Sequence, residues 1–122
     1  MKKNYLLLLL LLLIPISVSA QSEMRITCDS SQADPNSTVT CEVKAMDSEV
    51  SGGSGRFKVT NGTVKSIEKL HCAVGDVSTD EFACVDDIVQ GSITLVSFVV
   101  QTASSGQTII ELENAKVVGP VA

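Results

Sequence analysis

The residues best suited to chemistry in this 122-residue chain are four cysteines and a single histidine. Cys28, Cys41, Cys72 and Cys84 form an even set, which indicates two disulfide bonds in a short exported chain. Three pairings are open, and we favour Cys28–Cys41 with Cys72–Cys84 because each closes a short local loop. A metal site made from the thiols and His71 is disfavoured, because the paired C-x-x-C spacing of zinc sites is missing. We therefore expect neither a metal nor a cofactor.

Groups that catalysis requires are scarce. His71 has no partner motif and stands beside a cysteine expected in a disulfide, so we expect it to be structural. The sequence contains no G-x-S-x-G elbow, H-E-x-x-H motif or P-loop. Carboxylates are plentiful, and glycosidases use them in pairs, but a domain this small offers little room for a cleft. We predict no catalytic residues and a protein that is not an enzyme.

Two groups of charged residues are candidates for binding. Acidic residues gather between residues 76 and 87 and have the hard oxygens that Ca²⁺ prefers, but they lack EF-hand or dockerin-repeat spacing, so we expect solvated loops. Basic residues gather between residues 56 and 69, where a merged stripe would suit an acidic partner, and ordinary solvent-facing charge is the alternative. The acidic residues are Asp76, Asp80, Glu81, Asp86 and Asp87, and the predicted binding residues are Arg56, Lys58, Lys65 and Lys69.

The first twenty residues have the layout of a secretory signal peptide. Lys2 and Lys3 precede an unbroken leucine run, and Val18-Ser19-Ala20 supplies small residues at the cleavage positions. The apolar run is shorter than the roughly twenty residues that span a membrane. We predict cleavage after Ala20, which makes residues 1–20 the signal peptide and residues 21–122 one domain of a secreted, extracellular or cell-surface bacterial protein.

Charge and composition narrow the partners of the exported part. Two of the nine basic residues precede residue 20 and all fourteen acidic ones follow it, so the exported chain carries a net charge of −7. This balance argues against nucleic acid and anionic membrane surfaces as partners. The exported part has no Trp or Tyr, which removes the flat aromatic platform on which many sugar-binding modules stack their ligands. Asn36 and Asn61 begin glycosylation sequons that we expect to be unused.

Short apolar-alternating segments between turn residues predict an all-β fold. Alternation is clear over residues 24–28, 39–45, 92–102 and 107–118, and Asp34-Pro35-Asn36 predicts a turn. The run Ser51–Gly55 indicates a flexible or bulged stretch, and Asn61-Gly62 predicts a hairpin over Arg56–Leu70. About seven short strands without a long helix favour a two-sheet antiparallel sandwich, of jelly-roll or Ig-like type.

Residues 72–91 fit two structures. Ser78 and Glu81 have capping-box spacing, and Phe82, Val85 and Val89 would then line a helical face. A short strand over Glu81–Val85 fits equally, and we prefer it because Asp86-Asp87 resembles a following turn.

The closing third resembles the end of a cohesin domain. The similarity lies in Gly91–Val100, with alternating aliphatic, Phe and Val residues, and in Gly106–Ala115, with a Gly-x-Thr loop and a strand ending in Asn. At the other end, the first predicted strand, the polar loop after it and Thr38–Val43 resemble the first two cohesin strands. The resemblance implies a jelly-roll β-sandwich that binds dockerin modules in extracellular polysaccharide-degrading assemblies. The exported chain is shorter than a usual cohesin, its cysteines are not part of the cohesin pattern, and no dockerin-contacting motif matches.

These observations predict a secreted, non-catalytic interaction module of cohesin type that binds a dockerin-like protein partner. A carbohydrate-binding module that takes polysaccharide is the first alternative, and a generic Ig-like surface or adhesin domain is the second.

Overall fold

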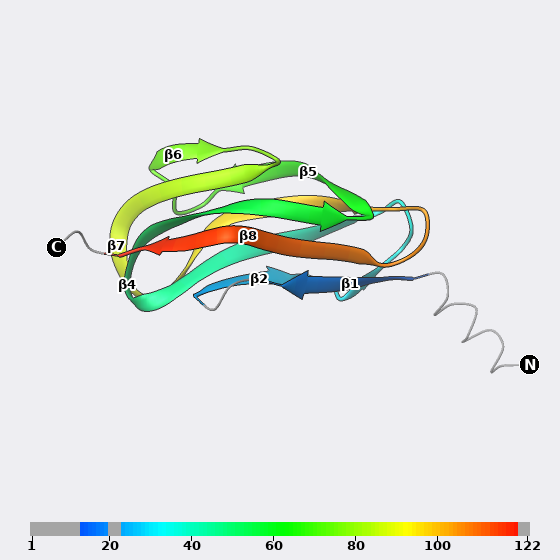
Figure 1. The fold of residues 1–122 in the computed structure, drawn as a ribbon, viewed down its shortest axis with the longest axis horizontal. Helices are drawn as coiled ribbons and strands as arrows, with labels where there is room; N and C mark the ends of the chain where they lie inside the picture. The colour runs from blue at the N-terminus through cyan, green and yellow to red at the C-terminus, as the bar shows by residue number, and fades with distance from the viewer. Residues whose placement is uncertain (1–12, 20–22, 120–122) are drawn as a thin grey trace, which may run out of the picture.

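Alternating apolar and polar residues form extended strands over most of the chain, because β-branched side chains pack well on a pleated surface. The computed structural model of the protein describes residues 13–19 and 23–119, and within them it has eight strands and no helix (Figure 1). The strands are β1 (Ile14–Ser19), β2 (Met24–Cys28), β3 (Gln32–Ala33), β4 (Thr38–Thr60), β5 (Gly62–Lys69), β6 (Val74–Val77), β7 (Glu81–Thr102) and β8 (Thr108–Val118).

Two very long strands organise the sheet. β4 and β7 pair antiparallel from Thr38↔Gln101 to Arg56↔Glu81, with shifts in register around Val50. Figure 1 shows both strands turning at one end of the molecule. Each long strand therefore contributes to two successive sections of the sheet.

The neighbours of β4 and β7 differ between the two sections. In the first section, β2 pairs with the start of β4 and β5 pairs with the end of β7. In the second section, β8 pairs with the end of β4 and β6 pairs with the start of β7. β1 then lies between β8 and β3.

Aromatic side chains join the two sections. The ring of Phe57, from the second section, lies 4.6 Å between centroids from that of Phe98, from the first. Phe82 lies 5.5 Å from Phe57, and all three rings are buried. The inward residues predicted on residues 39–45, 96–100 and 110–112 also belong to this core. The sheet therefore folds back so that both sections share one apolar centre.

The all-β prediction is confirmed, and the predicted arrangement of strands needs two corrections. β1 and β8 run parallel, so the sheet is mixed rather than wholly antiparallel. The strands also belong to one continuous open sheet, because β4 and β7 pass through both sections. The description as a jelly-roll or Ig-like sandwich stays a prediction.

The predicted Arg56–Leu70 hairpin is wrong. Asn61 has the positive φ of 58° that its turn signal implied. However, the end of β4 pairs with β8, and β5 pairs with the distant end of β7. The chain therefore crosses between sections at Asn61 instead of folding back on its neighbour.

Residues 72–91, for which the sequence allowed either a helix or a strand, form β6 and the start of β7. β7 begins at Glu81, as the preferred strand reading had it. The turn predicted at Asp86-Asp87 is wrong, because β7 continues through both residues and bulges there opposite Ser51. The polar segment before residue 38 has its turn at Pro35-Asn36, where Asn36 has a φ of 54°.

Both preferred disulfides are present. Cys28–Cys41 joins directly opposed residues of β2 and β4, and Cys72–Cys84 joins the residues before β6 to β7. Much of the predicted signal peptide lies outside the described residues, but its last part forms β1. Within residues 13–19 and 23–119, no helix is long and apolar enough to cross a membrane.

Candidate binding groove

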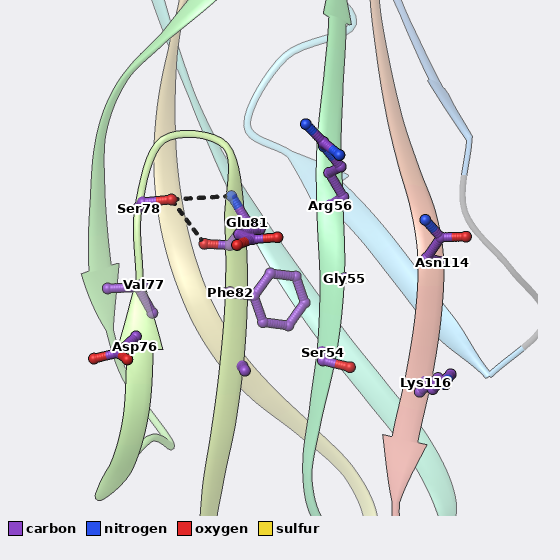
Figure 2. Close-up of a pocket in the computed structure, with 11 residues that line it drawn as sticks. Ser54, Gly55, Arg56, Asp76, Val77, Ser78, Glu81, Phe82, Asn114 and Lys116 are labelled. Atoms are coloured by element: carbon purple, nitrogen blue, oxygen red, sulfur yellow. Dashed lines mark hydrogen bonds between the residues drawn. The ribbon is translucent and has the colours of Figure 1, made fainter.

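The second section of the sheet carries a groove on its outward face. Ser54 and Arg56 of β4 lie between β7 and β8, since Arg56 pairs with Glu81 on one side and Glu113 on the other. The groove has a volume of about 560 Å³ (Figure 2). Its lining is Ser54, Gly55, Arg56, Asp76, Val77, Ser78, Glu81, Phe82, Ala83, Asn114 and Lys116.

A β-bulge shapes the β8 wall of the groove. Ser54 pairs with Lys116 and Arg56 pairs with Glu113, so two residues of β8, including Asn114, oppose Gly55 alone. Asn114 has a φ of 53°, a conformation that Asn tolerates better than most residues. Bulges re-aim side chains, and this one brings Asn114 and Lys116 to the groove.

A hydrogen-bonded turn holds the opposite wall. Ser78 Oγ accepts hydrogen bonds from the backbone N–H groups of Asp80 and Glu81, at 3.2 Å each. The Ser78 N–H donates to the Glu81 carbonyl at 2.8 Å. Figure 2 shows Ser78 and Glu81 joined across the bend between β6 and β7. The spacing that resembled a helix cap therefore serves a strand-to-strand turn.

Charges of both signs line the groove without neutralising each other. Arg56, Lys116, Asp76 and Glu81 all contribute to the lining. Among the described residues, the single salt bridge is Lys58–Glu113, at 3.6 Å. The four groove charges are therefore open to charged or hydrogen-bonding groups of a ligand.

An exposed apolar pair continues the outward face of β6 and β7. Asp76 is opposite Ala83 in the groove, and the next outward pair along the two strands is Val74 and Val85. Their exposed fractions are 69% and 44%, which are high for valine. Charged groups beside exposed aliphatic residues form a surface typical of protein recognition.

The four predicted binding residues do not form one stripe. Arg56 lies in the groove, and Lys58 forms the salt bridge with Glu113. Lys65 and Lys69 lie on β5, which does not pair with β4, and Lys69 Nζ donates to the Gly75 carbonyl at 2.9 Å. The predicted basic stripe required β4 and β5 to pair as a hairpin. Because they do not pair, Arg56 and Lys58 on β4 are separated from Lys65 and Lys69 on β5.

The acidic residues between 76 and 87 are also dispersed. Asp76 and Glu81 line the groove, and Asp80 lines a second depression beside Lys58. Asp86 Oδ2 accepts a hydrogen bond from the Ala73 N–H at 2.9 Å. Over residues 13–19 and 23–119, no three His, Cys, Asp or Glu side chains are grouped to hold a metal ion.

His71 lies close to the backbone. Its Nε2 is 2.7 Å from the Asp87 carbonyl oxygen, a contact that links the segment after β5 to the bulge of β7. The structural role expected of His71 stays a prediction.

The sequence singled out Arg56 as a binding residue, but it did not show which residues of β6 and β8 lie beside it in the groove. Asn114 was visible only as the Asn of the cohesin-like ending, and nothing local marked Lys116 or Asp76 as its neighbours. Comparison with protein-family models and with curated proteins finds no match to this chain.

Proposed function

We propose that this chain is an exported, non-catalytic interaction module of cohesin type that binds a dockerin-like protein through the groove. In this proposal the two sections of the sheet act as the layers of a β-sandwich, and β4, β6, β7 and β8 present the binding face. The observation that carries the proposal is the set of four uncompensated groove charges beside the exposed Val74–Val85 pair.

A protein partner fits this surface better than a sugar. Stacking on a sugar ring requires an exposed aromatic side chain, but Phe57, Phe82 and Phe98 are at most 8% exposed. Protein interfaces combine an apolar centre with charged and hydrogen-bonding groups at the rim, and the groove and valine pair supply both. Arg56 has a planar fork of hydrogen-bond donors, and arginine is one of the residue types enriched at the centre of protein interfaces.

Export is supported by the disulfides as well as by the signal sequence. Disulfide bonds persist in oxidising compartments outside the cytosol. Cys28–Cys41 and Cys72–Cys84 use every cysteine of the chain.

The test is a calorimetric titration of the exported protein with dockerin modules. We expect saturable binding at roughly micromolar Kd, and we expect Arg56→Glu with Lys116→Glu to weaken it about tenfold or more. Lys65→Glu is the control for each single reversal, Arg56→Glu or Lys116→Glu, because it reverses one cation outside the groove. An equal effect of Lys65→Glu would move the site to the predicted basic residues on β5.

Two results would remove the proposal. If no dockerin module binds at roughly 100 µM, the cohesin assignment fails. If the protein instead binds polysaccharides on a glycan array and the groove variants abolish that binding, the carbohydrate-binding alternative replaces it.

A further inference from the structure

The strand β1 occupies a slot that the predicted processing would empty. Ile14–Ser19 lies between two strands, running antiparallel to β3 and parallel to β8. The same residues form the end of the predicted signal peptide. Cleavage after Ala20 separates this strand from the domain.

The first half of β1 is packed into the core, whereas Val18 near its end is 43% exposed. Ile14 is only 2% exposed, and Ile16 packs against the core cluster. The Ile16 N–H donates to the Ser31 carbonyl at 2.8 Å. On the other side, Thr108 and Ile110 of β8 are fully buried beside the strand. Loss of β1 therefore uncovers both apolar side chains and backbone hydrogen-bonding groups.

The exported chain cannot refill the slot from its own start. Only three residues, 21–23, precede β2, whereas β1 has six. β2 itself is held by pairing with β4 from Met24 to Cys28 and by the Cys28–Cys41 bond. An unpaired strand edge above an apolar core readily takes up an added strand from another chain.

We infer that the slot between β3 and β8 is a second binding site, which takes an extended segment of a partner protein in the place of β1. The inserted segment runs parallel to β8 from Thr108 to Glu111 and has aliphatic residues at alternate positions, as Ile14 and Ile16 do. A second copy of this chain fits less well, because two β8 edges related by a two-fold axis would pair antiparallel. This inference rests on the export part of the proposed function but not on the groove.

The first arm of the test determines whether the slot is empty. The full chain is exported from a bacterial host with its own signal peptide, and the mass of the folded product gives its first residue. We expect Gln21. A product that retains Ile14 and Ile16 overturns the inference, because the slot is then never vacant.

The second arm measures binding with a defined peptide. The probe is Ile14–Ser19 joined to a neutral fluorescent linker, and the control peptide has Ile14→Asp and Ile16→Asp. We expect the probe to bind the exported protein at least about tenfold more tightly than the control and to raise its Tm. Equal binding of the two peptides, or none at roughly 100 µM, overturns the inference.

A matched protein provides the blocking control. An unrelated signal peptide placed before Ile14 yields an exported chain that keeps β1, and we expect this chain not to bind the probe. A homodimer that the probe dissociates would place a second copy in the slot and overturn the assignment to a partner protein. If the protein binds the probe but no dockerin module, only the cohesin-type proposal fails. If it binds a dockerin module but not the probe, only the inference of a second site fails.

Discussion

At the scale of single residues, glycine allows β4 and β7 to approach closely. The sequence predicts a flexible or bulged stretch over Ser51–Gly55, and the stretch lies inside β4, is largely buried, and carries register shifts at Ser51 and Gly55. A Cβ at Gly52 would lie 1.9 Å from the Cys84 carbonyl oxygen, which belongs to the paired strand. Here the glycine removes a side chain from a strand contact rather than supplying a turn.

Gly52→Ala should therefore destabilise the protein by about 3 kcal/mol, because backbone atoms of β7 must move to admit the methyl group. Urea denaturation measures the change. Gly119→Ala is the control, since a Cβ there would meet only the Glu49 carbonyl oxygen at an ordinary 3.5 Å. Similar losses for both variants would contradict the close approach at Gly52.

Asn61 combines a backbone role and a side-chain role at the crossing between sections. Its φ is 58°, and its Nδ2 donates to the carbonyls of Ser105 and Gln107 at 2.8 Å and 3.1 Å. Asn61→Gly loses the side-chain bonds but keeps the conformation, so we expect a loss of about 1 kcal/mol. Asn61→Ala also strains the backbone and should cost about 1 kcal/mol more. Thermal denaturation that ranks Ala above Gly in stability would refute this account.

At the scale of elements, the sequence predicted strands better than their pairing. Local alternation identified residues 24–28, 39–45 and 92–102, because inward and outward faces have a period of two. It could not show that β5 pairs with β7 instead of β4, since the partners of β5 lie far along the chain, from Lys69↔Val96 to Gly62↔Thr102. The parallel strand β1 was missed because its residues also fit a signal peptide.

The same limit applies to the candidate site. Arg56 stood out as a cation in an acidic chain, but its neighbours Asp76, Asn114 and Lys116 come from two other strands, β6 and β8. Only the register of β4 with β7 and β8 brings them together. The bulge at Asn114 has no clear local signal, because the alternation of β8 is already weak there.

The element most dependent on a disulfide is β6. β6 has four residues and pairs only with β7, while Cys72–Cys84 ties its start to that strand. Replacing both cysteines by Ala should cost about 3 kcal/mol on the chain-entropy model. Hydrogen exchange should accelerate at Val74–Val77 but not in β2. Equal acceleration in both strands would show a global effect instead of a local one.

At the scale of the whole molecule, a single sheet folds back on itself, and its two sections pack against each other where two separate sheets were predicted. The backbones of β4 and β7 run without a break through both sections. The groove and the slot lie in the same section, on either side of β8.

The packing between sections depends on Phe57 and Phe98, which gives a direct test of the folded-back sheet. Phe57→Leu and Phe98→Leu should each destabilise the protein. Either substitution alone removes the contact between the two rings, so the double variant does not lose that contact a second time. A double-mutant cycle should therefore show a coupling of about 0.5–1.5 kcal/mol. Phe57→Leu combined with Asp47→Ala, an exposed residue near the bend, should be additive. Urea denaturation of the four proteins of each cycle measures both quantities. If the two phenylalanine effects simply add, the sections do not pack against each other through these rings, and the sandwich-like arrangement fails with them.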